Sequence, residues 1–251
     1  MTSFVDTLRI VVGKRWSFVV ALFVLEMAAI LIISNSAFFP GELSSTQQQY
    51  NQIKPVLNQD ALGQVVGIFA NNFRVAIIEL IPIGGPTIFA FSIYETARIV
   101  EVIGISNGEG AGAALGTLFF LPSTWLELPA YAVAVTESCY LLYAVYAGFS
   151  RGWGVFTREI RFLFVSILSI VGILLIAAVF EVTEIQIEFF TQPPAPAAEG
   201  LLVLLTWIPF AYVFWKAVSF WRSSRKVASQ LEAMDAAEAA QSQGGPPGWE
   251  I

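Results

Sequence analysis

The hydrophobic pattern of this chain consists of long apolar runs separated by short polar stretches. A helix needs about 20 predominantly apolar residues to cross the hydrocarbon core of a bilayer. Six runs approach that length and predict transmembrane helices at residues 16–38, 62–81, 87–105, 125–149, 162–180 and 201–221. A further apolar run, residues 111–120, is about half as long as a crossing. The pattern therefore predicts an all-α polytopic helical membrane bundle with six transmembrane helices and a re-entrant half-helix between the third and the fourth.

The polar stretches between these runs predict loops and turns. Residues 39–62 are rich in glutamine and residues 181–199 are acidic and proline-rich, so both predict exposed loops. The Pro-Ile-Gly-Gly-Pro sequence at 82–86 predicts a tight turn that ends the second span. The basic stretch 151–161 predicts a short loop between the fourth and fifth spans.

The chain is predicted to form a single membrane domain, residues 1–226, followed by a tail. Residues 2–15 predict either a short lead-in helix or an amphipathic helix in the membrane interface, and the spacing of their apolar residues fits both. Pro209 is a position where the sixth span is expected to kink. Residues 227–251 predict a cytoplasmic tail that begins with helix-forming residues and ends in a segment of disordered composition.

The distribution of basic residues predicts the orientation of the bundle. Six alternating crossings place most of them beside loops on one side: Lys14, Arg15, Arg151, Arg158, Arg161, Lys216, Arg222, Arg225 and Lys226. Loops rich in lysine and arginine stay in the cytoplasm. We therefore expect a multi-pass protein of the cell membrane with both termini cytoplasmic.

Composition excludes several functional classes. Of the 251 residues, 56% are hydrophobic and only 13% are charged, against about 25% charged in soluble domains. The chain has no histidine and one cysteine, which excludes imidazole metal sites and internal disulfides. Its net charge of −6 argues against nucleic acid as a partner. We expect no enzyme activity and no cofactor, and we expect as partners the lipid bilayer and either further copies of the chain or other membrane and soluble proteins.

Polar side chains within the predicted spans are the candidate functional residues. An ionised side chain in the middle of a membrane costs roughly 2.5–3.5 kcal/mol, so each should have a partner or contact water. The candidates for a binding or structural polar core are Asn71, Asn72, Arg74, Glu79, Glu95, Arg98, Glu101, Glu127 and Glu137.

Helical spacing of about 100° per residue groups these candidates on three helix faces. Those of the second span occupy one half of its helical wheel, and those of the third occupy about a third of its wheel. Glu127 lies on a face of small residues in the fourth span, and Glu137 borders that face. If the three faces meet, we expect Arg74 to pair with Glu127, and Arg98 to lie between Glu95 and Glu101.

Two interpretations of this group remain open. Either the charges hold the helices in register, or they form a path for a proton, a cation or another substrate. The five glutamates outnumber the two arginines, so some glutamates are expected to be protonated or hydrated.

The order of the motifs in residues 69–137 resembles that of the stage II sporulation protein M family. The motif-like residues are Asn71, Asn72 and Arg74, then Asn107 and Gly108, then Leu121, Pro122, Glu127 and Ala130. Ser123 and Thr124 stand where the family usually has His-Gly. The resemblance implies a polytopic membrane protein, and the sporulation member of the family anchors a peptidoglycan-remodelling complex in the membrane.

These observations predict a structural or assembly component of a membrane complex, of the stage II sporulation protein M-like type. The alternative is a transporter or permease subunit that uses its intramembrane carboxylates. A third class is a permease driven by a separate ATPase subunit, since this chain has no ATPase motif of its own.

Overall fold

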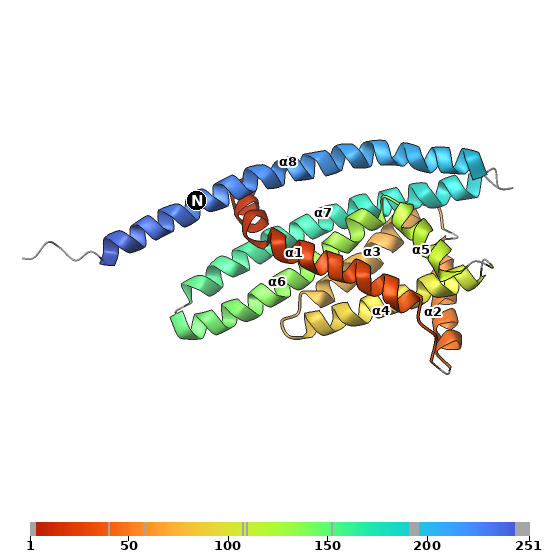
Figure 1. Ribbon diagram of the computed structural model, residues 1–251, viewed down its shortest axis with the longest axis horizontal. Coiled ribbons are helices and arrows are strands. Elements are labelled where there is room, and N and C mark those ends of the chain that lie inside the picture. The colour runs from red at the N-terminus through yellow and green to blue at the C-terminus, as the bar shows by residue number, and fades with distance from the viewer. Residues whose placement is uncertain are drawn as a thin grey trace, which may run out of the picture.

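A computed structural model describes residues 4–39, 41–57, 59–106, 108, 110–151, 153–190 and 196–243. In these ranges the chain forms eight α-helices and no strand (Figure 1). The helices are α1 (Phe4–Ser34), α2 (Glu42–Leu57), α3 (Ala61–Glu79), α4 (Gly84–Ser106), α5 (Ala111–Phe120), α6 (Thr124–Arg151), α7 (Gly154–Phe190) and α8 (Pro196–Gln243).

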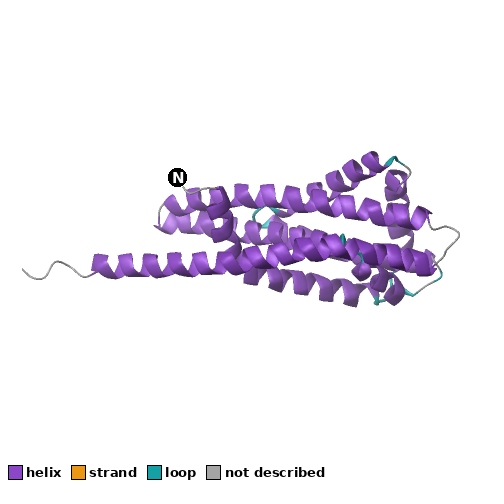
Figure 2. Ribbon diagram, turned by 90° about the horizontal axis from the view of Figure 1, so that it is seen from above, coloured by secondary structure: helices purple, strands orange, loops and turns teal. Residues whose placement is uncertain are grey.

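The long helices run roughly along one common direction (Figures 1 and 2). The most extensive contacts are those of α6 with α7 and of α1 with α8. The short helices α2 and α5 lie at one end of the bundle, which we call the α2–α5 end. The connection between α6 and α7 lies at the opposite end, the α6–α7 end, near the start of α1 and the end of α8 (Figure 1). A buried core that includes Ile30, Ala76, Phe89, Ala134 and Leu174 joins α1, α3, α4, α6 and α7.

Five of the described helices contain segments that are long and apolar enough to cross a membrane: Ile10–Ser34, Ala61–Glu79, Thr124–Ser150, Phe156–Ile187 and Val203–Lys226. Five of the six predicted spans fall on these segments. The third predicted span corresponds to α4, whose 23 residues include three charged side chains near its middle and end. The architecture is therefore that of a membrane-embedded helical bundle with five clearly apolar helices.

The prediction of an exposed loop over residues 39–62 is wrong, because most of that stretch forms α2. Its first residue, Glu42, accepts a hydrogen bond from the Phe39 N–H at 2.6 Å. A carboxylate in the first turn also interacts favourably with the helix dipole. Glutamine is a good helix former, so the composition that indicated a loop is equally compatible with a short polar helix.

The helix that contains the fifth predicted span, residues 162–180, is longer than the sequence pattern predicts. The helix α7 begins at Gly154 and continues to Phe190, so it includes much of the predicted loops 151–161 and 181–199. Its polar ends are held by other helices, because Glu159 pairs with Arg15 and Glu184 accepts a hydrogen bond from the Ser123 hydroxyl at 2.5 Å. Residues 191–195 lie outside the described part of the chain.

The terminal helices are also longer than predicted. The lead-in segment and the first span form one helix, α1. The helix α8 passes through Pro209 and continues beyond residue 227 to Gln243. The end of the predicted tail, residues 244–251, lies outside the described residues.

Candidate functional site

A polar cavity of about 320 Å³ lies between α1, α3, α4 and α6 and is open to the surface on one side. It brings together five of the nine predicted residues: Asn71, Asn72, Arg74, Glu95 and Glu127. Four polar residues that the sequence analysis did not select, Glu26, Ser92, Thr96 and Tyr131, also line it. The predicted meeting of the second, third and fourth spans is therefore present, and the first span contributes to it as well.

Besides Glu95, which is only half-buried, three carboxylates lie in the wall of this cavity or behind it without an ion pair to a described residue: Glu26 and Glu127 in the wall, and Glu79 behind it. Glu26 is 3% exposed, and Glu79, directly behind Ser92, is 0% exposed. Glu79 accepts a hydrogen bond from the Ser92 hydroxyl at 2.7 Å, and Glu127 accepts one from the Tyr131 hydroxyl at 2.7 Å. In the described part of the chain, no ion pair reaches these three carboxylates.

The buried carboxylates also retain unused hydrogen-bonding capacity. One oxygen of Glu26 and one of Glu79 are buried without a hydrogen-bond partner among the described atoms. The charges of Glu79 and Glu127 act on Glu26, so the three groups form one electrostatic cluster. Buried polar atoms without partners are uncommon in native proteins and require an explanation, such as a functional role.

Arg74 does not make the ion pair that the sequence suggested. Its side chain is exposed at the open side of the cavity, and the described residues include no acidic partner within ion-pair distance of it. Glu127 instead binds Tyr131, which lies one helical turn further along α6. The neighbouring Asn71 amide lies 3.3 Å from the side-chain oxygen of Asn72 and donates to it.

Arg98 belongs to a separate cluster at the α2–α5 end. Its guanidinium lies 2.8 Å from Glu101, as predicted, and its Nε lies 2.8 Å from Glu42 of α2. It also donates to backbone carbonyls where α1 ends, with the Ser36 oxygen at 2.8 Å and the Ile33 oxygen at 3.1 Å. Ile33 lies in the last turn of α1 and Ser36 follows that helix, so Arg98 binds the end of α1 and links it to α2 and α4.

Glu95, the other predicted neighbour of Arg98, lines the cavity instead. Glu42 takes its place in the cluster and also accepts a hydrogen bond from the Tyr94 hydroxyl. Desolvation works against ionisation of Glu42. The hydrogen bonds from Tyr94 and the Phe39 N–H, together with the charge of Arg98, outweigh that effect and hold the pKa of Glu42 below its usual value.

This lowered pKa predicts a pH-dependent contribution to stability. Glu42 stabilises the fold at pH values above its pKa in the unfolded chain, and the contribution is lost as the pH falls through the lower folded-state pKa. We expect Glu42→Gln to lower the free energy of unfolding by about 1 kcal/mol at pH 7 and by much less at pH 3. Reversible unfolding in mixed micelles at both pH values measures the difference. An equal effect at the two pH values would contradict this role.

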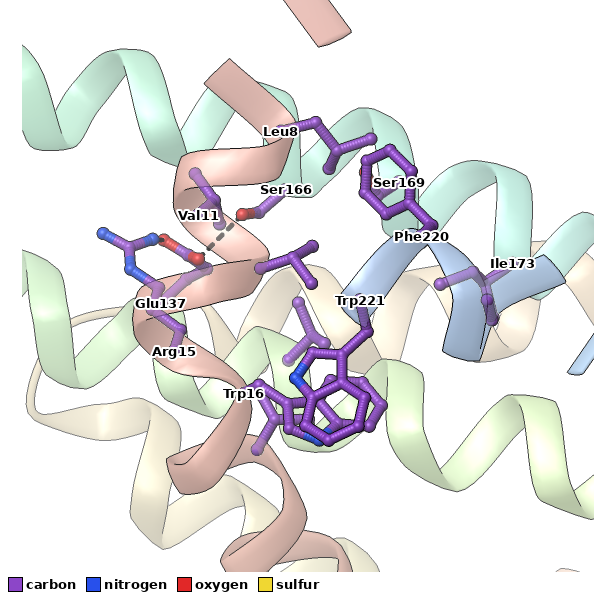
Figure 3. Close-up of a pocket in the computed structure, with 14 residues that line it drawn as sticks. Leu8, Val11, Arg15, Trp16, Glu137, Ser166, Ser169, Ile173, Phe220 and Trp221 are labelled. Carbon is purple, nitrogen blue, oxygen red and sulfur yellow. Dashed lines mark hydrogen bonds and ion pairs between the residues drawn. The ribbon is translucent and has the colours of Figure 1, made fainter. Parts of the chain in front are cut away.

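Glu137, the ninth predicted residue, lies in a third cluster beside Arg15 and Ser166 (Figure 3). Its carboxylate pairs with Arg15 of α1, which also pairs with Glu159 of α7. The Ser166 hydroxyl donates to Glu137 at 2.7 Å. Arg15 is 3% exposed and Glu137 is 1% exposed, and the Tyr140 ring centroid lies 4.3 Å from the Arg15 guanidinium carbon. This buried cluster joins α1, α6 and α7.

Sequence reasoning did not identify Arg15 and Glu159 as members of this cluster. The sequence pattern places Arg15 beside a cytoplasmic loop with the other basic residues, and Glu159 lies in the stretch 151–161 that predicts a loop. One available signal was Glu137 itself, a charge within an apolar span that needs a cation of its own. The extended α7 supplies the second carboxylate because Glu159 lies on it.

The residues of the family-like motif have well-defined surroundings. Gly108 adopts a positive φ of 71°, and Asn107 lies outside the described residues. Ser123 binds Glu184, which connects the start of α6 to α7. Ala130, Ala134 and Ser138 are completely buried, as expected for a face of small residues in close contact with other helices.

No family model, curated protein or solved structure matches this chain. The structure is that of a membrane-embedded, multi-helix protein with an internal polar cavity. The cavity presents carboxylates and hydroxyl groups, which can take up, hold and release protons. No cluster of three metal-ligating side chains suitable for a metal ion occurs among the described residues.

Proposed function

We propose that the chain crosses the cell membrane six times, with both termini in the cytoplasm. Both α3 and α6 begin at the α2–α5 end, so α4 must return the chain to that end between them (Figure 1). The charged residues of α4 are accommodated, because Arg98 and Glu101 pair near its end and Glu95 lines the cavity. The ten-residue helix α5 is then a re-entrant segment. The basic residues near the α6–α7 end make that end the cytoplasmic one.

Within this architecture, we propose that the protein is a transporter or permease subunit coupled to proton movement. One observation carries this proposal: Glu26 and Glu127 line an open polar cavity, Glu79 lies behind it, and none of the three forms an ion pair with a described residue. Arginine holds the carboxylates in the other two clusters. The paired clusters therefore serve the fold, whereas the unpaired carboxylates remain available for chemistry. Intramembrane carboxylates in such surroundings typically belong to proton relays.

The cavity groups can pass a proton between neighbours. Tyr131 and Ser92 each hold one carboxylate by a hydroxyl group, which can both donate and accept a proton. Glu26 and Glu127 line the open cavity, whereas Glu79 lies deeper. A neutral carboxyl group at one position can supply the proton that an ionised neighbour accepts. Arg74, at the open side, can attract an anionic part of a substrate.

Reconstitution into liposomes tests this function. We expect the wild-type protein to collapse an imposed proton gradient, as reported by a pH-sensitive dye enclosed in the vesicles. Glu26→Gln and Glu127→Gln should reduce the rate to nearly that of protein-free liposomes, because an amide cannot carry the proton. Glu101→Gln is the matched control, since that carboxylate pairs with Arg98 away from the cavity. Rates that are equal in the wild type and in both cavity variants would overturn the proposal.

A second candidate is the assembly component that the resemblance to stage II sporulation protein M implies. The observation in its favour is the part of α8 from Lys226 to Gln243, which follows the last apolar segment and extends past the α6–α7 end (Figure 1). Such a helix offers a surface for another subunit or for a second copy of the chain. The absence of proton flux, together with partner proteins that co-purify with the full chain but not with a chain ended at Lys226, would favour this function.

A further inference from the structure

A second cavity, which takes no part in the proposed proton chemistry, lies between α1, α6, α7 and α8 (Figure 3). Its volume is about 250 Å³, and its walls are mainly apolar. Each of the four helices contributes apolar side chains, including Val11, Val19, Val133, Ile173 and Phe220. A hydrocarbon group that enters such a cavity gains dispersion contacts and leaves water, so the walls favour an apolar ligand.

The polar groups of this cavity bind mainly one another. Glu137 is held by Arg15 and Ser166, and the Ser169 hydroxyl donates to the Val165 carbonyl at 2.9 Å. These groups therefore have little capacity left for a charged ligand. The part of a ligand that enters the cavity should be a hydrocarbon chain.

Trp16 and Trp221 separate this apolar cavity from a more polar one. Their ring centroids are 5.5 Å apart, and both residues line both cavities. The second cavity has a volume of about 360 Å³ and includes Ser17 and Arg225 in its walls. The indole nitrogen of Trp221 is buried and has no hydrogen-bond partner in the described part of the structure. A donor without a partner thus lies at the junction of the two spaces.

Arg225 supplies a positive charge beside this junction. Its guanidinium carbon lies 5.6 Å from the Trp221 ring centroid, its side chain is exposed, and no described residue forms an ion pair with it. The apolar cavity, the indole donor and the arginine thus follow one another in the order of the parts of a phospholipid. Basic pockets between membrane helices are known to bind anionic lipid headgroups.

We propose that this site binds one anionic phospholipid. An acyl chain occupies the apolar cavity, an ester carbonyl accepts a hydrogen bond from the Trp221 indole, and the headgroup phosphate binds Arg225. The site would tie α8 to α1 through a lipid, in addition to the direct contact between the two helices.

Native mass spectrometry of the purified full chain in detergent, with added phosphatidylglycerol or phosphatidylcholine of identical acyl chains, tests the proposal. We expect a single bound lipid, with phosphatidylglycerol favoured. Arg225→Gln should weaken phosphatidylglycerol binding about fivefold, the contribution of one basic residue near an anionic headgroup, and should leave phosphatidylcholine binding unchanged. Arg222→Gln, on the same exposed stretch of α8 but outside both cavities, is the matched control and should behave as the wild type.

Two further experiments distinguish the contribution of the lipid's acyl chain from that of its headgroup. Ala217→Leu adds bulk to the wall of the apolar cavity and should weaken the binding of both lipids. Glycerol phosphate, which has the anionic phosphate but no acyl chain, should not displace the bound lipid. Equal retention of the two lipids by the wild type, equal losses in Arg225→Gln and Arg222→Gln, or displacement by glycerol phosphate would each overturn the proposal. These outcomes are independent of proton flux.

Discussion

Replacing Arg15 with methionine is expected to lower the free energy of unfolding by about 3–5 kcal/mol, the typical effect of removing one partner from a buried ion pair. Arg15 is the only described basic residue that pairs with Glu137, and it also pairs with Glu159. Its loss leaves the buried Glu137 without a cationic partner among the described residues and leaves Glu159 with only the largely exposed Arg158. Reversible unfolding in mixed micelles, followed by circular dichroism, measures this change.

Two controls define the origin of the effect. Arg158→Met removes a neighbouring arginine whose side chain is 55% exposed and lies 3.6 Å from Glu159. An exposed pair of this kind contributes about 0–1 kcal/mol, so this variant should remain close to the wild type. The triple variant Arg15→Met, Glu137→Gln and Glu159→Gln removes all three charges and should recover most of the lost stability. A triple variant as unstable as Arg15→Met alone would show that packing, and not charge, is responsible.

Hydrophobic periodicity predicts the membrane helices and which polar side chains share a face of one helix. Apolar runs of span length predicted all five helices that are long and apolar enough to cross a membrane. Helical spacing groups the polar residues of each helix on one face, and the separate hypothesis that the faces of α3, α4 and α6 meet agrees with the lining of one cavity by Asn72, Glu95 and Glu127. These predictions succeed because the 3.6-residue repeat determines which side chains share a face.

The partners of the charged residues could not be predicted in the same way. Periodicity describes one helix at a time, whereas an ion pair depends on how helices are placed relative to one another. Arg98 binds Glu42 from α2, a helix that the composition did not reveal, and Arg15 binds Glu159 from a part of α7 that was expected to be a loop. In both cases a polar residue that looks like part of a loop is buried against a helix distant in sequence.

The distribution of paired and unpaired charges separates the roles of the three clusters. The Arg15 and Arg98 clusters each join three helices, and each neutralises carboxylates with an arginine. The carboxylates of Glu26, Glu79 and Glu127 lack such a partner. Arginine-paired clusters that hold the helices in place allow the bundle to tolerate unpaired carboxylates at the cavity, as the proposed proton transfer requires.

Gly85→Ala is expected to lower the free energy of unfolding by about 3 kcal/mol, at the upper end of the usual effect of overpacking. Gly85 is buried where the α3–α4 turn meets α6. A Cβ atom at this position would overlap the Glu79 carbonyl oxygen and the Ser138 hydroxyl. That hydroxyl donates to the Ile81 carbonyl at 2.8 Å, and the Gly85 N–H donates to the same carbonyl at 2.7 Å. The added methyl group would therefore push the turn away from α6.

The adjacent Gly84 provides the matched control. A Cβ atom there would meet only the Ile81 side chain, at an ordinary distance of 3.6 Å. Gly84→Ala should therefore be neutral or slightly stabilising, because alanine restricts the unfolded chain more than glycine does. The same comparison bears on function, since Glu79 is the last residue of α3 and a displaced turn would weaken its hydrogen bond with Ser92. Equal stability of the Gly85→Ala and Gly84→Ala variants would mean that the turn has room to move and does not fix the position of Glu79.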